Sequence, residues 1–304
     1  MGERAFGAEE MWAGGGYLEI DESERDPERA RVLVIPAPFD GTSTWVKGAD
    51  RGPDAIIEAS QHLENYEPED GWEPSVRGVA THRGVDAGAG LEGVVREIEG
   101  VVGRALDLGK IPVVLGGEHS VSIGAIRAAA ARSERLTVVQ IDAHSDLRDS
   151  YHGSRLNHAC VMARAREVAS IVQIGLRSVS REELEGMEPE RTFWAHEIVD
   201  APDEAWMGRV ESLLDGDVYV TIDLDGFDPA LVPATGTPEP GGLGWGQVSR
   251  LLGRVAARAR IVGGDVVELC PAPGQHASAQ VAAKITQRLI SCALRSQGLG
   301  PERG

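Results

Sequence analysis

LTVVQIDAHSD, residues 136–146, is an apolar run that continues into metal-binding side chains at every second position. The β-branched part predicts a buried strand. Because an extended backbone places residues i, i+2 and i+4 on one face, Asp142, His144 and Asp146 are expected to point into one cavity. The pattern therefore predicts a strand whose end carries metal ligands.

A second apolar run, Val218 to Ile222, continues in the same way into Asp223-Leu224-Asp225. Carboxylates at neighbouring strand ends would repel one another and resist ionisation unless cations neutralise them. A mixed imidazole and carboxylate set suits manganese, zinc or iron, which indicates a binuclear metal hydrolase. Six candidate ligands are enough for two cations if two carboxylates bridge: His119, Asp142, His144, Asp146, Asp223 and Asp225.

Apolar runs of strand length alternate with amphipathic stretches along the chain. Continuous apolar runs are typical of strands buried on both faces, and the alternation predicts an α/β fold with a parallel sheet. We expect one domain over residues 1–304, with flexible tails at about 1–28 and 298–304. The predicted strands are Val32 to Ile35, Ile111 to Leu115, Leu136 to Ile141, Ile171 to Ile174, Val218 to Ile222 and Ile261 to Val267. The helical stretches include Val94 to Leu108, Ser122 to Ala131, Asp203 to Leu214, Gln247 to Ala259 and Ala277 to Leu294.

Chemically active side chains follow four of these strands. In open parallel sheets, ligands bind beyond the carboxyl ends of the strands. Gly116-Gly117-Glu118-His119-Ser120 follows one apolar run, and Glu268 follows Ile261 to Val267. Together with the two acidic clusters, these strand ends are expected to offer ligands to one rim.

Composition excludes several classes of function. The 304 residues carry a formal charge of -18, which argues against nucleic-acid partners because those need a basic face. The charge is compatible with a cationic substrate, although surplus acidic residues usually serve solubility. We find no signal peptide and no run of membrane-spanning length, so no membrane association is expected. Three separated cysteines without a CxxC pair fit a reducing cytoplasm.

The motifs closely resemble those of the ureohydrolase family, the arginases and agmatinases. The resemblance extends from about Val32 to the C-terminal helix. It implies a three-layer α/β/α fold with a central, mostly parallel sheet, as in arginases and deacetylases, and a homo-oligomer, a trimer or hexamer. The segments that carry it are Gly41-Thr42-Ser43, Gly48 to Ala55, Gly117 to Ser120, Asp142 to Asp146, Asn157-His158-Ala159, Asp223 to Pro229, Gly236 to Leu243 and Asp265 to Leu269. Several of these are more similar to agmatinases than to arginases.

Carried over position by position, the resemblance implies two Mn²⁺ ions per subunit. One ion would be bound by His119, Asp142, Asp146 and Asp223, and the other by Asp142, His144, Asp223 and Asp225. Two nearby cations activate water for attack on a guanidinium carbon. Asp146 would accept the proton and pass it to the leaving nitrogen. Glu268 matches the family's guanidinium-binding glutamate, and His158 matches its proton-shuttling histidine.

The substrate expected from the resemblance is agmatine, which is hydrolysed to putrescine and urea. The arginase pattern is only partly present, since Ser154 lies four residues before His158 but Leu156 lies two before it. Arg155 departs from the agmatinase pattern, and an entrance cation would repel agmatine or attract a carboxylate, although a surface arginine is the simpler interpretation. The presence of Arg155 keeps guanidinobutyrase, guanidinopropionase and other guanidino-acid or amidino hydrolases as alternatives, followed by arginase.

Three other interpretations use the same residues. A mononuclear zinc deacetylase on a related scaffold needs one zinc and lacks the full paired set of ligands. A non-catalytic metal-binding subunit would keep the site without turnover, but the presence of His158 and Glu268 argues against it. A glycosyltransferase DxD motif would need a phosphate-binding glycine loop or a basic groove, and neither accompanies Asp223-Leu224-Asp225. Glu118 and Asp228 are expected to orient ligands or stabilise turns.

Overall fold

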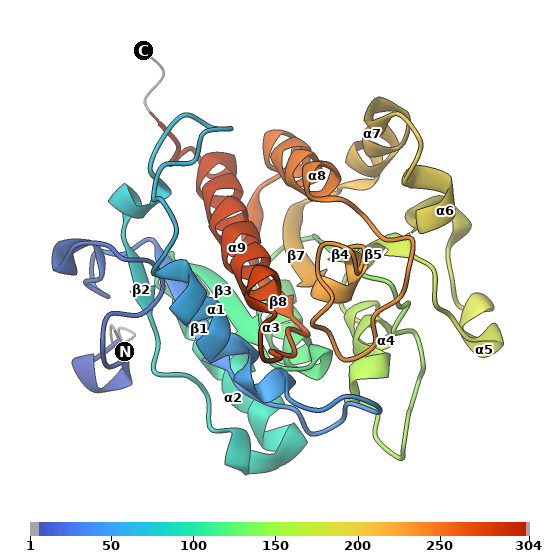
Figure 1. The fold of residues 1–304 in the computed structure, drawn as a ribbon, viewed down its shortest axis with the longest axis horizontal. Helices are drawn as coiled ribbons and strands as arrows, with labels where there is room; N and C mark the ends of the chain where they lie inside the picture. Colours follow the sequence, from blue (N-terminus) through green and yellow to red (C-terminus); the bar gives the residue numbers. More distant parts are fainter. Residues whose placement is uncertain (1–5, 302–304) are drawn as a thin grey trace.

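A β-sheet lies between two layers of helices in the computed structural model (Figure 1). The structure describes residues 6–301, and within them the sheet has eight strands in the order β2-β1-β3-β8-β7-β4-β5-β6. Every pair of neighbouring strands is parallel. The strands are β1 Val32–Ala37, β2 Val79–Thr81, β3 Ile111–Gly116, β4 Leu136–Ile141, β5 Ser170–Leu176, β6 Thr192–Trp194, β7 Asp217–Asp223 and β8 Ile261–Val267. The predicted α/β/α fold is confirmed.

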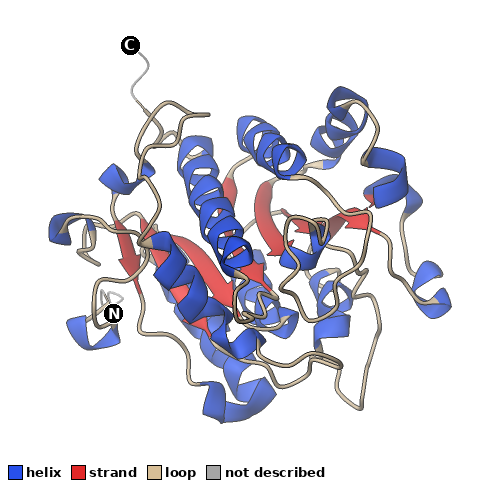
Figure 2. Ribbon diagram, viewed as in Figure 1, coloured by secondary structure: helices blue, strands red, loops and turns tan. Residues whose placement is uncertain are grey.

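Helices cover both faces of the sheet (Figure 2). Helices α1, α7, α8 and α9 contribute to one hydrophobic cluster, and α2, α3 and α4 contribute to the other. Successive residues of β1 alternate between the two clusters, because neighbouring strand residues point to opposite faces. The helices are α1 Gly52–Ser60, α2 Gly90–Asp107, α3 Ser122–Ala130, α4 Val161–Ala165, α5 Arg181–Leu184, α6 Ala195–Ile198, α7 Asp203–Leu213, α8 Trp245–Arg258 and α9 His276–Ser296. None of these described helices combines the length and hydropathy that crossing a bilayer requires.

The strands predicted from the sequence are the six inner strands of the sheet. The predicted bounds of β4 and β8 match the observed ones. The strands β1 and β3 are one or two residues longer at their carboxyl ends, and β5 and β7 are longer at both ends. The edge strands β2 and β6 have three residues each, which is too short for an apolar run to be recognised. Helix α1 was not predicted, since it is short and begins with Gly52-Pro53, a pair that is typical of loops.

The prediction of poorly packed tails is wrong for the described part of residues 1–28. Tyr17 and Leu18 are fully buried, and the Tyr17 hydroxyl donates to a backbone carbonyl of α9 at 2.7 Å. At the other end of the chain, Leu299 packs partly against the core. These isolated apolar residues follow neither a helical nor a strand period, so the sequence carries no pattern for their burial. The rest of the predicted tails, residues 1–5 and 302–304, lies outside the described residues.

Four adjacent strands at the centre of the sheet, β3, β8, β7 and β4, lead into the candidate site. Their carboxyl ends lie at one edge because the sheet is parallel. In the sheet, β8 and β7 lie between β3 and β4, although both follow β4 in the sequence. This topology brings residues from four distant parts of the sequence to one place, as expected for a ligand site in an open α/β sheet.

Candidate metal centre

The predicted metal-binding side chains meet at the carboxyl ends of the central strands. Asp142 follows the last residue of β4, and Asp223 is the last residue of β7. His119 follows β3 through a tight turn in which only glycine fits at position 117. A Cβ atom there would lie 2.1 Å from the carbonyl oxygen of Phe39. The turn therefore brings His119 beside the two acidic strand ends.

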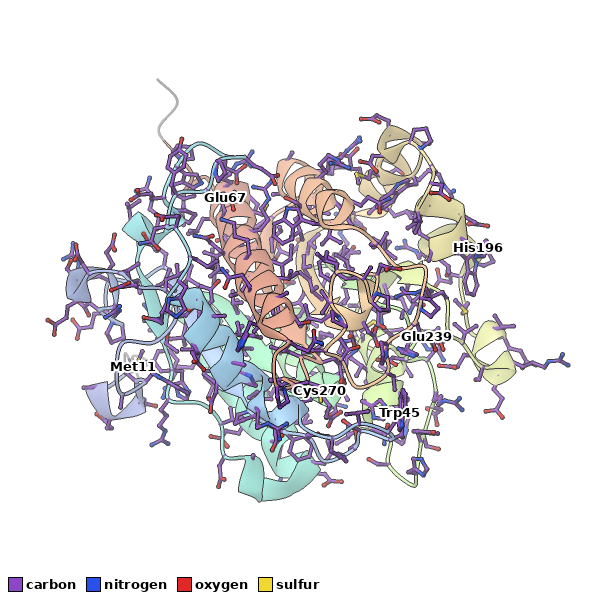
Figure 3. The ribbon with its side chains drawn as sticks, in the orientation of Figure 1. Met11, Trp45, Glu67, His196, Glu239 and Cys270 are labelled. Atoms are coloured by element: carbon purple, nitrogen blue, oxygen red, sulfur yellow. The ribbon has the colours of Figure 1, made fainter. Side chains whose placement is uncertain are left out.

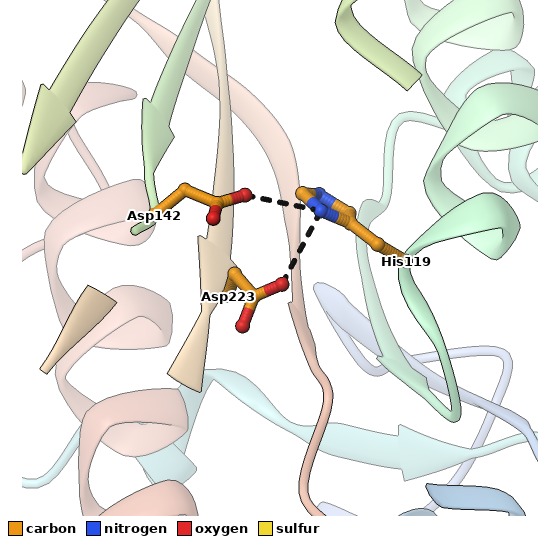
Figure 4. Close-up of side chains that lie close together, drawn as sticks. All are labelled: His119, Asp142 and Asp223. Carbon is orange, nitrogen blue, oxygen red and sulfur yellow. Dashed lines mark ion pairs between the residues drawn. The ribbon is translucent and has the colours of Figure 1, made fainter. Parts of the chain in front are cut away.

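The first group of candidate ligands surrounds His119 (Figure 4). Its Nδ1 atom lies 3.2 Å from Asp142 Oδ2, 3.4 Å from Asp223 Oδ2 and 2.9 Å from Asp146 Oδ2. Nδ1 is buried and makes no hydrogen bond to any described residue. A buried, unpartnered ring nitrogen that faces carboxylates is the arrangement a divalent cation would complete.

The second group is formed by Asp142, His144 and Asp225. His144 Nδ1 lies 2.9 Å from Asp225 Oδ2 and 3.7 Å from Asp142 Oδ1. Asp142 thus belongs to both groups and presents a different oxygen to each histidine. In each group the ligand atoms lie within 4.8 Å of one another. The residues fit two neighbouring cations with Asp142 between them, while the bridging role of Asp223 stays a prediction.

The acids of the site destabilise one another when no cation is present. Burial and the charge of Asp142 raise the pKa of Asp146 to about 7. Burial and the neighbouring acids Asp225 and Asp142 raise the pKa of Asp223 well above its ordinary value. Burial also acts on Asp142, but its contacts with His119 and His144 bring the pKa of this carboxyl below the ordinary value. Such a cluster is stable in its ionised form only beside compensating positive charge.

A buried chain of hydrogen bonds holds the other nitrogen of the His119 ring. Nε2 lies 2.9 Å from Thr221 Oγ1, and Thr221 donates to Asp265 Oδ1 at 2.5 Å. Tyr219 donates to the second oxygen of Asp265 at 2.9 Å. Because the single hydroxyl proton of Thr221 goes to Asp265, His119 Nε2 must be the donor to Thr221. In the neutral ring Nδ1 then has the lone pair that a metal ligand requires.

Amide and guanidinium groups hold the ligand-bearing segments from outside. Gln140 Nε2 donates to Asp142 Oδ2 at 2.7 Å, and Gln173 in turn donates to Gln140 Oε1 at 2.6 Å. Arg177 donates to the backbone carbonyl of Asp225 at 2.6 Å. Sequence reasoning did not find these residues, nor Thr221 and Asp265. For Gln140, Gln173, Thr221 and Asp265 the signal was a polar side chain inside a buried strand, whereas Arg177 follows β5.

The predicted turn-stabilising role of Asp228 agrees with its contacts. Its carboxylate accepts backbone N–H bonds from Gly241 and Gly242, at 2.8 and 3.0 Å. A third bond comes from the Ala230 N–H at 2.9 Å. These bonds lower the pKa of Asp228 and join the segment after β7 to the segment before α8.

Two candidate catalytic residues have a left-handed backbone conformation. Asp146 has a φ of 51° and Glu268 a φ of 67°, values that non-glycine residues seldom adopt. Glu268 Oε1 accepts the backbone N–H of His119 at 2.7 Å, while Oε2 has no hydrogen-bond partner among the described residues. Burial and the charges of Glu118 and Asp225 raise the pKa of Glu268 well above its ordinary value. Strain of this kind concentrates at functional sites.

A cavity of about 290 Å³ lies over the cluster and contains the remaining predicted residues. His158 and Glu268 line it together with most of the metal-binding side chains, while Asp142 is buried beneath it. Its outer wall includes Thr44, Arg148, Tyr151, Ser178, Ser180, Glu183 and Thr237. Trp45, next to Thr44, extends into solvent with 71% of its surface exposed (Figure 3). The structure thus brings all eight predicted site residues together.

Arg155 does not line this cavity. Its guanidinium pairs with Asp149 at 2.9 Å and with Glu167 at 3.1 Å. The arginine of the cavity wall is Arg148, which the sequence did not single out. Its guanidinium carbon lies 4.9 Å from the centre of the Tyr151 ring. The surface interpretation of Arg155 therefore agrees with the structure.

Comparison with known proteins places the chain in a family. A model of the arginase family matches residues 30–292. The chain belongs to the arginase family. It is 37% identical over 273 residues to the N(1)-aminopropylagmatine ureohydrolase of Synechocystis, covering 86% of this chain and 88% of that one. It is 35% identical over 278 residues to the agmatinase of Pyrococcus horikoshii, covering 89% and 94%.

Solved structures agree with this assignment. The agmatine ureohydrolase of Thermoplasma volcanium superposes with a TM-score of 0.81 at 37% identity, covering 89% of this chain and 92% of that one. The arginase of Bacillus subtilis superposes with a TM-score of 0.68 at 25% identity, covering 85% and 98%. The chain is an arginase-family ureohydrolase, an enzyme that hydrolyses a C–N bond of a guanidino group. The family membership predicted from the motifs is confirmed.

Proposed function

We propose that this enzyme hydrolyses agmatine to putrescine and urea and that it uses two manganese ions. The choice of this substrate is supported by relatives named agmatinase and N(1)-aminopropylagmatine ureohydrolase, which are 35% and 37% identical to this chain over most of both lengths. Five carboxylates line the cavity, and Arg148 is the one Lys or Arg among its described lining residues. With two divalent cations beside the aspartates and Glu268 on the guanidinium, Glu183 balances Arg148, so the wall keeps no surplus positive charge that would favour a carboxylate tail.

The proposed metal ligands are the ones implied by the family resemblance. His119, Asp142, Asp146 and Asp223 would hold one ion, and Asp142, His144, Asp223 and Asp225 the other. The unpartnered His119 Nδ1 and the shared Asp142 support a pair of sites. When bound, the manganese pair would supply positive charge that makes water acidic enough to become a nucleophile near neutral pH.

The protein's own groups would perform the remaining steps. Glu268 Oε2, which has no other partner among the described residues, accepts N–H bonds from the guanidinium and fixes its carbon over the site. Asp146 accepts a proton from the water whose oxygen bonds to that carbon. The proton then passes to the leaving nitrogen as the C–N bond breaks, which releases urea and the amine. His158 exchanges the remaining proton with solvent.

N(1)-aminopropylagmatine is the second candidate substrate. A relative with this activity in its name is 37% identical over most of both chains. The compound has the same guanidino group and a longer tail that carries a further positive charge. Both compounds present a guanidino group and a positively charged tail, and they differ in the length and the charge of that tail.

A substrate panel tests the proposal. Manganese-loaded protein is mixed with agmatine, N(1)-aminopropylagmatine, 4-guanidinobutyrate, 3-guanidinopropionate and arginine, and both urea and the amine product are measured. We expect the highest kcat/KM for agmatine, and a higher value for N(1)-aminopropylagmatine would select the second candidate. A higher value for a guanidino acid or arginine would contradict the assignment of the tail. No urea from any compound would contradict the function, and an Asp146→Asn preparation serves as the control for contaminating activity.

A further inference from the structure

Thr42 makes two hydrogen bonds with His158. Thr42 Oγ1 accepts the backbone N–H of His158 at 3.0 Å and lies 2.9 Å from the ring atom Nδ1. The same hydroxyl donates to Glu118 Oε2 at 2.8 Å. Glu118 is fully buried, and His158 lines the cavity. A histidine of the cavity wall is therefore linked through one hydroxyl to a buried carboxyl group.

The protons of this cluster can be assigned by counting donors. The Glu118 carboxylate already accepts Ser120 Oγ–H on Oε1 at 2.6 Å and Ser120 N–H on Oε2 at 3.2 Å. Glu118 Oε2 therefore accepts from both the Ser120 N–H and the Thr42 hydroxyl. Thr42 thus donates its single hydroxyl proton to Glu118. Thr42 Oγ1 can only accept from His158, so Nδ1 must carry the proton.

The rest of the His158 surroundings supports this assignment. Thr42 Oγ1 has two lone pairs, and the backbone N–H and Nδ1–H of His158 use both. The Tyr151 ring stands edge-on to the His158 ring, with centroids 6.1 Å apart and an interplanar angle of 85°. No described residue is hydrogen-bonded to Nε2. The ring is thus held on its Nδ1 side, and Nε2 is the nitrogen left for the cavity.

We propose that Thr42 and Glu118 are positioning residues that hold His158 in the Nδ1–H tautomer, with an unprotonated Nε2 presented to the substrate. The tautomer itself follows from the hydrogen bonds. Its consequence for turnover rests on the proposed function, in which His158 exchanges protons with the reacting groups. In the opposite tautomer Nε2 would carry a proton and could not accept one.

Nitrogen-15 NMR of the histidine rings tests the tautomer directly. The full chain is loaded with Zn²⁺, a diamagnetic divalent cation, and the His158 signals are assigned from a His158→Gln spectrum. We expect a protonated Nδ1 and an unprotonated Nε2 in the unmodified chain. A protonated Nε2 in the unmodified chain would overturn the proposal.

A pair of variants tests the role of the hydroxyl. Thr42→Val keeps the shape of the side chain and removes the hydroxyl, whereas Thr42→Ser keeps the hydroxyl. We expect Thr42→Val to populate the Nε2–H tautomer and to lower kcat about tenfold with KM changed less than about twofold. Thr42→Ser should recover both the tautomer and most of the turnover. An unchanged tautomer and an unchanged kcat in Thr42→Val would contradict the proposal.

The two readouts separate this inference from the proposed function. If the unmodified chain shows Nδ1–H but releases no urea from any guanidino compound, the proposed function fails and the positioning role stands. If it releases urea but shows Nε2–H, the positioning role fails and the function stands. Metal content and melting temperature, measured on every variant, identify any loss that comes from unfolding.

Discussion

Two threonine–carboxylate pairs contact two histidines of the same cavity, and they engage opposite ring nitrogens. At His119, Nε2 is hydrogen-bonded to Thr221, whose hydroxyl donates to Asp265, and Nδ1 faces the acidic cluster. At His158, Nδ1 is hydrogen-bonded to the hydroxyl of Thr42, and Nε2 is free to face the cavity. The same kind of hydrogen-bonded pair therefore fixes opposite ring nitrogens, as the proposed metal ligand His119 and the proposed proton carrier His158 require.

The two histidine side chains also differ in their exposure to solvent. The side chain of His119 is 1% exposed, and its pair comes from the interior strands β7 and β8. The side chain of His158 is 20% exposed, and Thr42 comes from a loop. A metal ligand gains from rigid, dry surroundings, whereas a proton carrier must reach solvent.

The largest effect is expected at Asp146, whose Oδ2 lies 2.9 Å from His119 Nδ1. Asp146→Asn removes the charge of a proposed metal ligand that is also the proposed proton acceptor, so kcat should fall by at least about 10³-fold. Asparagine tolerates the φ of 51°, so the backbone should be kept. Urea release measured at saturating agmatine checks this. A kcat within about tenfold of the unmodified enzyme would show that Asp146 does not carry the proton.

A smaller effect is expected from Asp265→Asn, which weakens the support of His119 without touching a ligand. Loss of such outer partners typically lowers metal affinity about 10- to 100-fold. Titration with Mn²⁺ measures the affinity, and Thr42→Val is the matched comparison because it alters the other threonine pair. Equal affinity losses in the two variants would mean that the pairs do not act on separate histidines.

The smallest effect is expected at His82, a buried histidine that is not hydrogen-bonded to a threonine–carboxylate pair among the described residues. Burial lowers its pKa to about 4. As pH falls, the unfolded chain therefore binds a proton first, and stability is lost between about pH 6.5 and 4. His82→Gln should reduce the loss of unfolding free energy between pH 8 and pH 6 by about 1 kcal/mol. Urea unfolding at both pH values measures it, and an identical loss in both proteins would contradict the shift.

The sequence predicted those features that have a local pattern. The inner strands were found because each is a continuous apolar run. Five of the six candidate ligands were found because they alternate at strand ends, and His119 because its Gly116-to-Ser120 segment follows an apolar run. The edge strands β2 and β6 are too short to show such a pattern. Burial of Tyr17 depends on a contact with α9, far along the chain, and no local period reports it.

The supporting residues of the site could not be predicted for the same reason. Thr42 is 116 residues from His158, and Thr221 is 102 residues from His119. Each makes its contact only because the parallel sheet brings distant strand ends together. A threonine or an aspartate inside a strand has no sequence signal that names its partner. The roles of Glu268 and His158 rested on family resemblance, and they stay predictions.

Anomalous X-ray scattering from crystals of the manganese-loaded enzyme tests the dinuclear centre most directly. Two peaks are expected, one among His119, Asp142 and Asp223 and the other among Asp142, His144 and Asp225. A single peak, or peaks away from these side chains, would contradict a two-manganese site.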